Sequence, residues 1–154
     1  MSGFTIRVSR GEAPAEARAI RRRVFVEEQG VASDEEWDEH DAAGAGTLHF
    51  VAYDGRRVVG CARLRAYDGA AKIERVAVLP EQRGLGLGRA LMEAAERAAR
   101  EQGHTRLVLH AQSAVIPFYE RLGWRALGPE FQEAGIPHRK MEKPGSARAR
   151  PLRG

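Results

Sequence analysis

Three glycines alternate through one short stretch of the chain and are the first residues to suggest chemistry. The stretch EQRGLGLGRA spans residues 81–90, with glycine at positions 84, 86 and 88. Glycine weakens helices and strands by roughly 0.5–1 kcal/mol relative to alanine, so such a cluster needs a reason in the backbone. The preceding residues have the pattern of a strand and the following residues that of a helix.

A strand, a glycine-rich turn and a helix N-terminus together are typical of an anion site. The first N–H groups of a helix have no partner within it, and the helix dipole adds about half a positive charge there. Glycines leave room for phosphate oxygens to reach these groups. Arg83 and Arg89 flank the turn and can add charge-assisted hydrogen bonds. A tight helix entry that binds nothing is the alternative, and a short motif alone does not separate the two.

Two well-known phosphate-binding motifs do not fit this turn. The dinucleotide motif G-x-G-x-x-G, started at Gly84, requires glycine where the chain has Arg89. The P-loop motif requires glycine followed by Lys-Ser or Lys-Thr, and neither dipeptide occurs in the sequence.

The elements that would position the turn follow from the apolar periodicity and the turn residues. Their order is β-α-β-β-β-α-β-α-β-β, which predicts an α/β or α+β domain with a mixed sheet. The predicted elements are a strand around Phe4–Val8, a helix over 13–28, a hairpin over 47–65 turning at Asp54–Gly55, a strand over 71–79, a helix over 89–103, a strand over 105–111, a short helix over 114–123 and two closing strands, 124–128 and 138–143, around a loop over 129–137.

Length and composition favour one soluble domain over residues 1–143. The chain has 154 residues, of which 43% are hydrophobic and 30% charged. It contains no apolar run of the ~20 residues that span a bilayer, and its first residues alternate like a strand, unlike a signal peptide. Cys61 is the only cysteine, so no intramolecular disulfide can form and a reducing, cytoplasmic location is expected. We interpret Cys61 as a small core residue and not a nucleophile.

The high isoelectric point, about 9.7, comes from the C-terminal tail. Residues 143–154 carry four lysines and arginines and no acid, and without them the net charge of +4 falls to zero. We therefore expect residues 144–154 to form a basic, disordered tail, and nucleic-acid binding becomes a minor alternative.

Several motifs, in the correct order, resemble the GNAT N-acetyltransferase superfamily. Arg83-x-x-Gly86-x-Gly88 matches its Q/R-x-x-G-x-G/A signature, and IERVAVLPEQRGLGLGRALM as a whole is similar to its strand–turn–helix unit. FYERLGW resembles its second motif, whereas VFVEEQG and EAGIPHRKMEK resemble the small bacterial ElaA/YjcF-like branch. The resemblance extends from the first strand to Lys143.

The resemblance implies a mixed, mostly antiparallel central sheet flanked by helices and splayed between the strands before and after the turn. It implies acetyl-CoA as acetyl donor and an amine acceptor that is a small molecule or a peptide. We expect no metal, and neither nucleic acid nor a membrane as a partner, whereas a homodimer is left open. The histidines show no spacing typical of a metal site. The residues it implies for the cofactor are Val76, Ala77, Val78, Arg83, Gly84, Leu85, Gly86, Leu87, Gly88, Arg89, Gln112 and Phe118.

The same resemblance implies catalytic roles for two side chains. Glu74 is the expected general base, two residues before Val76 and therefore on the same face of the strand. The N–H of Val76 would stabilise the oxyanion. Tyr119 is the expected general acid for the leaving thiolate. The alternatives are a surface glutamate and a packing tyrosine, and the ElaA-like branch often has a small residue where this chain has Glu74. Gln112 and the nearby His110 fit ordinary strand-end polar residues equally well.

Acceptor binding is expected at Glu28 and His138. Eight acids and no lysine or arginine lie over residues 27–41, which suits a cationic amine but more often indicates a solvated face. The predicted function is an acetyl-CoA-dependent N-acetyltransferase, an acyltransferase acting on amino groups by direct attack. The alternative is a catalytically weak or inactive CoA-binding or regulatory protein of the same fold.

Overall fold

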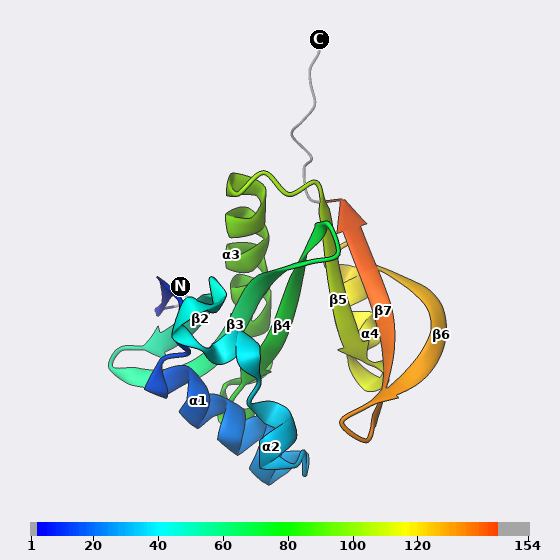
Figure 1. Cartoon of the computed structure of the whole chain (residues 1–154). Coiled ribbons are helices and arrows are strands. Elements are labelled where there is room, and N and C mark those ends of the chain that lie inside the picture. The colour runs from blue at the N-terminus through cyan, green and yellow to red at the C-terminus, as the bar shows by residue number, and fades with distance from the viewer. Residues whose placement is uncertain (1–2, 145–154) are drawn as a thin grey trace. The chain divides into compact units, whose positions relative to one another are not determined.

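The computed structural model describes residues 3–144 of the chain (Figure 1). The predicted tail over 144–154 lies outside the described residues, apart from Pro144, which ends the last strand. The strands are β1 (Phe4–Arg10), β2 (Leu48–Asp54), β3 (Arg57–Tyr67), β4 (Ala70–Val78), β5 (Arg106–Gln112), β6 (Arg125–Glu133) and β7 (Ile136–Pro144).

The helical segments and strands follow one another in the predicted order, with extra short turns in the acidic stretch and after β4. None within residues 3–144 is long and apolar enough to cross a membrane. They are α1 (Ala15–Arg21), η1 (Arg22–Glu28), α2 (Ser33–Glu36), η2 (Glu39–Asp41), η3 (Ala43–Ala45), η4 (Pro80–Gln82), α3 (Leu87–Glu101), η5 (Ser113–Val115) and α4 (Ile116–Arg121).

The strands form one seven-stranded sheet in the order β1-β2-β3-β4-β5-β7-β6. The β1–β2, β2–β3, β5–β7 and β6–β7 pairs are antiparallel, whereas β4 and β5 run parallel, with Ala71 opposite Leu107. The predicted mixed, mostly antiparallel sheet is thus confirmed. The parallel pair needs a crossover connection, and α3 supplies it.

Backbone contacts divide the chain into two compact units. The first comprises the chain up to Arg65 together with Ile73–Ala95, and the second comprises Ala66–Lys72 together with the chain from Glu96 onward. The single domain expected over 1–143 stays a prediction.

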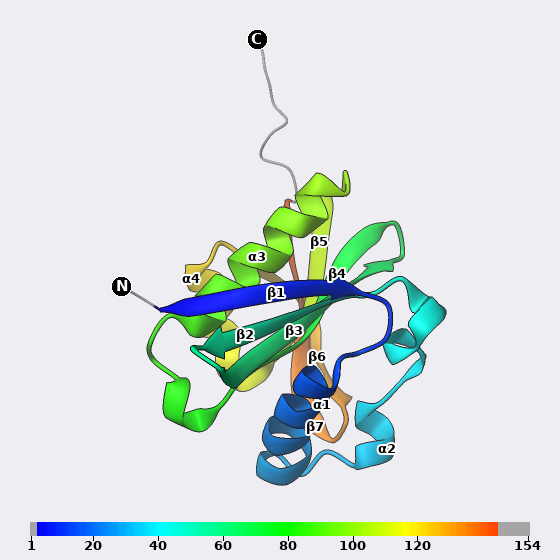
Figure 2. The same cartoon turned by 90° about the vertical axis from the view of Figure 1, so that its left-hand side faces the viewer.

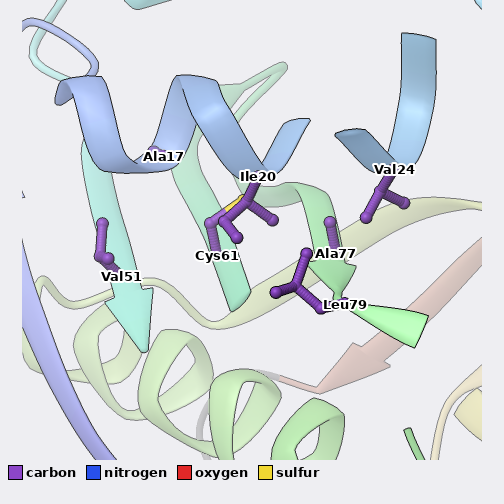
Figure 3. Packing of buried hydrophobic residues seen from close by; sticks show 7 residues of the cluster. All are labelled: Ala17, Ile20, Val24, Val51, Cys61, Ala77 and Leu79. Carbon is purple, nitrogen blue, oxygen red and sulfur yellow. The ribbon is translucent and has the colours of Figure 1, made fainter. Parts of the chain in front are cut away.

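The first unit contains a core between α1 with η1 and the strands β2, β3 and β4. Figure 2 shows β1, β2 and β3 side by side, and Figure 3 shows the side chains that fill this core. Cys61 is buried in this core, as predicted, and burial raises the pKa of its thiol to about 12. The cluster consists of Ala17, Ile20, Val24, Val51, Cys61, Ala77 and Leu79.

The predicted helix over 13–28 changes its winding halfway. Residues 15–21 are α-helical, but from Arg22 onward the turns are wider, and the N–H of Gln29 donates to the carbonyl of Val24, five residues back. Such π-helical turns are uncommon and often occur near functional sites. This stretch includes Glu28, one of the predicted site residues.

In the second unit, β5, β7 and β6 lie side by side (Figure 1). The sequence analysis was wrong about the loop over 129–137. β6 continues to Glu133, and only Ala134 and Gly135, both with positive φ, form the turn to β7. A register shift between Leu127 and Phe131 accommodates Gly128 and Pro129, residues that would otherwise interrupt a strand.

We predict that Gly60→Ala destabilises the protein by about 1–3 kcal/mol, because α3 and β4 approach β3 too closely for a side chain there. A Cβ at Gly60 would lie 2.9 Å from the carbonyl oxygen of Ala77 and 3.2 Å from methyl groups of Leu87 and Leu91. Urea unfolding measures the loss. Gly44→Ala is the control, since nothing lies within 4 Å of a Cβ there. Equal stability of the two variants would contradict the close packing.

Candidate active site

The glycine turn follows β4 and leads directly into α3. Gly84 and Gly86 have φ values of 83° and 87°, which only glycine adopts without strain. The carbonyl of Gly86 accepts the first helical hydrogen bond, from the N–H of Ala90 at 3.0 Å. Gly86 therefore caps the helix without a side chain, and the N–H groups of the next residues have no partner inside the helix. Nothing lies within 4 Å of a Cβ placed at Gly84 or Gly86.

This open surface fits a phosphate group. An anion could reach the N–H groups at the start of α3 without displacing a side chain, and the helix dipole would favour it. Leu85, between the two glycines, is 60% exposed, whereas Leu87 is buried, so Leu87 can take part only through its backbone. Binding of the acetyl-CoA diphosphate at this turn stays a prediction, with which the open space at Gly84 and Gly86 is compatible.

The guanidinium of Arg83 is held beside this turn by two partners. Its Nε donates to the carbonyl of Val78 at 3.0 Å, and both terminal nitrogens donate to the carboxylate of Glu28 at 2.8 Å. The hydrogen bond from Arg83 is the main reason why the pKa of Glu28 is lowered. Predicted separately as an acceptor residue and a cofactor residue, Glu28 and Arg83 form one ion pair. Arg89 pairs on the surface with Glu93.

Strand β4 carries an unusual backbone conformation at Arg75. Its φ is 55°, a left-handed value that is uncommon for a residue other than glycine. The regular alternation of side chains along the strand therefore breaks between Glu74 and Val76. The sequence analysis placed these two residues on one face by counting two positions, and that count does not hold through Arg75. Ala77 is buried in the core, and Val76 and Val78 are half-buried.

Four arginines and four carboxylates form a connected set in the first unit, which we call the arginine–carboxylate network. Arg21 donates to Glu36 at 2.8 Å and to both oxygens of Asp41 at 2.7 and 2.9 Å. Arg63 donates to Asp41 at 3.0 Å, and thus shares this carboxylate with Arg21. The network consists of Arg21, Arg63, Arg65 and Arg75 with Glu36, Asp38, Asp41 and Glu74.

Glu74, the predicted base, belongs to this network. Its Oε1 accepts from Nε of Arg63 at 3.0 Å and from Nε of Arg65 at 2.8 Å. Its Oε2 accepts from Arg65 at 3.1 Å, and the side chain is only 8% exposed. The structure thus excludes an exposed surface glutamate and surrounds the carboxylate with guanidinium groups.

Burial and pairing with arginines have opposite effects on the pKa values of the carboxylates in the network. The side chains of Arg21 and Arg63 are each 1% exposed. Burial by itself would raise the pKa of Asp41, but the hydrogen bonds from Arg21 and the charges of both arginines hold it well below its usual value. Burial outweighs pairing at Glu36, whose pKa is raised.

The acidic stretch over 27–41 contains both exposed carboxylates and carboxylates that pair with arginines. Glu36 and Asp41 are buried, and they and Asp38 pair with arginines of the network. Glu28 pairs with Arg83. The partner arginines come from α1, β3, β4 and the glycine turn, which lie before or after the stretch in the sequence.

Tyr119 lies on α4 in the second unit, and its side chain is buried. Burial raises the pKa of its hydroxyl to about 12, so Tyr119 keeps its proton at neutral pH. The ring of Phe118 stands edge-on to it with centroids 5.0 Å apart. A protonated hydroxyl is what a general acid requires.

Two other predicted residues meet across β5 and β7. Gln112 ends β5 and lies opposite His138 in the register. His138 is buried, and its Nδ1 lies 2.7 Å from the carbonyl oxygen of Ile136. The sequence assigned Gln112 to the cofactor and His138 to the acceptor, but the structure places them as direct neighbours.

Sequence reasoning missed the aromatic and acidic groups around them. Phe131 lies opposite His138, and its ring stacks on the imidazole at 6.1 Å. Glu133 accepts a hydrogen bond from His110, whose ring is edge-on to Tyr67. Reading residues 129–137 as a loop concealed the alternation of Phe131 and Glu133, which places both on one face of β6.

Within the part of the chain that the structure describes, no group of three or more His, Cys, Asp or Glu side chains is arranged to hold a metal ion.

Comparison with known proteins identifies the class to which this fold and these residues belong. Residues 15–144 match the model of the acetyltransferase (GNAT) domain family. The chain therefore belongs to the GNAT acetyltransferase family. Among its relatives is the uncharacterised N-acetyltransferase YjcF of Bacillus subtilis strain 168, 43% identical over 125 residues, which make up 80% of this chain and 87% of YjcF.

Solved structures show the same fold. An acyl-CoA N-acyltransferase from Pseudomonas aeruginosa superposes with a TM-score of 0.78 at 29% identity, over 91% of this chain and 99% of that one. Escherichia coli ElaA superposes with a TM-score of 0.76 over 90% of this chain and 99% of its own, and its 23% identity supports the fold alone. These findings confirm the resemblance to the ElaA/YjcF-like branch.

We predict that Arg75→Gly is more stable than Arg75→Ala by about 1 kcal/mol, because alanine keeps the strain of the left-handed backbone and glycine does not. Both variants lose the contacts of Arg75 with Glu36 and Asp38 equally. Thermal or urea unfolding measures the difference.

Arg65 provides the control, since its backbone is not among the positive-φ residues. There the order should reverse, with Arg65→Ala more stable than Arg65→Gly by about 0.5–1 kcal/mol. The same order at both positions would show that Arg75 is not strained.

Proposed function

We propose that this protein transfers an acetyl group from acetyl-CoA to an amine by direct attack of the amine on the thioester. The observation that carries the proposal is the glycine turn, where Gly84 and Gly86 leave the helix N-terminus bare for a diphosphate. Membership of the GNAT family supports it. Acetyl-CoA, when bound, supplies the activated carbonyl and a thiolate leaving group.

The protein's own groups then have distinct tasks. The turn from Gly84 to Arg89 holds the diphosphate through backbone N–H groups, and β4 offers the backbone of Val76, Ala77 and Val78 to the pantetheine arm. The N–H of Val76 stabilises charge that develops on the carbonyl oxygen. Tyr119, whose hydroxyl carries its proton at neutral pH, donates that proton to the departing sulfur.

Arg83 and Glu74 position neighbouring groups. The ion pair with Glu28 and the bond to the carbonyl of Val78 keep Arg83 at the entrance of the turn. Taking up a proton at Glu74 would break its pairing with Arg63 and Arg65. We therefore propose that Glu74 mainly holds these two arginines, while its role as a base stays a prediction from the sequence.

The first test compares two glycines that both have positive φ, one in the glycine turn and one in the turn between β6 and β7. Gly86→Ala and Gly135→Ala both put a Cβ into open space at positive φ, 87° and 75°, so both should lose similar stability. We expect only Gly86→Ala to weaken coenzyme A binding, by at least about tenfold, because its Cβ would occupy the space that the diphosphate needs. Isothermal calorimetry measures the affinity.

The same preparations are assayed for release of thiol from acetyl-CoA with a panel of amines. Amine-dependent release by the wild type supports the proposed transfer. Coenzyme A binding without release under any condition would favour the CoA-binding or regulatory alternative. Absence of binding at millimolar coenzyme A would contradict both the acetyl transfer and the CoA-binding alternative.

We predict that Glu74→Gln lowers kcat/KM by the same factor at every pH between about pH 6 and about pH 9. Glutamine keeps an oxygen acceptor for Arg63 and Arg65 but removes the charge, so the loss comes from weaker positioning and not from proton transfer. Glu142→Gln is the control, since Glu142 also accepts from an arginine, Arg106 at 2.8 Å. A loss that grows steeply as the pH falls would restore Glu74 as the general base.

A further inference from the structure

Strands β5, β6 and β7 bring several chemically active side chains to one face of the second unit. Directly opposite residues in a sheet share a face, and side chains two positions apart along a strand do so as well. Gln112 lies opposite His138, and His138 lies opposite Phe131. His110 and Glu133 lie two positions from Gln112 and Phe131. All five residues therefore belong to the same face.

His110 is the centre of this group. Its Nδ1 lies 2.9 Å from Oε1 of Glu133, within hydrogen-bond distance. Its ring is edge-on to Phe131, with centroids 5.1 Å apart, and to Tyr67, with centroids 6.1 Å apart. These contacts on three sides define the orientation of the imidazole.

The carboxylate of Glu133 determines which nitrogen of His110 carries the proton. The hydrogen bond from His110 is the main cause that lowers the pKa of Glu133, so this carboxylate is ionised at neutral pH and only accepts. The neutral imidazole therefore keeps its proton on Nδ1, and the lone pair of Nε2 is left to accept another. A base oriented by a third group recurs in many enzymes.

Other charged and titratable groups surround the pair. Lys72 of β4 is buried, with Nζ 4.7 Å from the centre of the Tyr67 ring, and its charge also helps to lower the pKa of Glu133. From β7, His138 stacks on Phe131, and Lys140 lies opposite His110 in the register. Two lysine side chains thus belong to the surroundings of the His110–Glu133 pair.

We propose that His110 is the general base that takes the proton from the acceptor amine, with Glu133 as its positioning residue. The rings of Tyr67 and Phe131 flank the base and form an apolar wall for the acceptor. This inference rests on the proposed acetyl transfer and names its proton acceptor. It concerns side chains that lie outside the arginine–carboxylate network, in which Glu74 is already paired.

The proton balance closes with groups of this chain and water. Nε2 of His110 takes one proton from the ammonium form of the acceptor, and the free amine forms the C–N bond as the C–S bond breaks. Tyr119 gives its hydroxyl proton to the sulfur. The new amide nitrogen and His110 each release one proton to water, and one returns to Tyr119. One proton is thus released per turnover.

The test compares His110→Gln with His104→Gln, a histidine in the turn before β5. We expect His110→Gln to lower kcat/KM by about 10²–10⁴ near neutral pH, with a smaller loss at high pH where the amine deprotonates unaided. Coenzyme A binding by calorimetry should be unchanged. Added imidazole should restore activity to His110→Ala, which a purely structural role would not allow.

The role of Glu133 is tested by measuring which nitrogen of His110 carries the proton, and this measurement does not require turnover. Long-range ¹H–¹⁵N NMR, with the His110 signal assigned by its loss in His110→Gln, should show Nδ1–H in the wild type and a mixture in Glu133→Gln. Glu133→Asp should retain more activity than Glu133→Gln. An Nε2–H tautomer in the wild type would overturn the proposal.

The outcomes separate this inference from the proposed function. Wild-type activity together with a His110→Gln variant that matches His104→Gln in its pH profile overturns only the assignment of the base. A wild type that releases no thiol with any amine overturns the acetyl transfer and the catalytic role of His110 together.

Discussion

Two guanidinium groups withdrawn from water, those of Arg21 and Arg63, constrain how the elements of the first unit are arranged. Removing a charge from water is costly unless pairing is close and complete, and breaking such a pair typically costs about 3–5 kcal/mol. Asp41 binds both arginines at once, which makes it the point where α1, η2 and β3 are tied together. The short helices α2 and η2 would not form alone, so this pairing gives their segment its shape.

The network also neutralises part of the negative charge of the acidic stretch. Along the sequence, residues 27–41 look strongly negative, but four of their eight acids face arginines from other elements. The exposed acids that remain include Glu27, Asp34 and Glu35. Attraction of a cationic acceptor by this stretch is correspondingly weaker. In the mechanism that we propose, the second unit offers a different basis for recognition, in which aromatic rings and one oriented imidazole would contact the acceptor.

Requirements of the backbone, and not side-chain chemistry, explain why glycine occurs at several positions. Gly60 allows β3 to lie against β4 and α3, and Gly86 leaves the helix N-terminus open. Arg75 adopts a left-handed conformation that would suit glycine better, yet its guanidinium lies 2.9 Å from Glu36. Its Nε is nevertheless one of two buried side-chain polar atoms without a hydrogen bond among residues 3–144. The left-handed backbone at Arg75 thus occurs at a residue whose charged side chain lies beside Glu36 and Asp38.

The sequence alone determined the order of the elements, the glycine turn and the family, because these depend on local periodicity and on residues close together in the chain. It did not reveal the extent of β6, since Gly128 and Pro129 imitate a loop until a register shift accommodates them. Nor did it show that Glu28 pairs with Arg83, 55 residues away. Partners of charged and aromatic side chains depend on which strands become neighbours, and only the tertiary structure decides that.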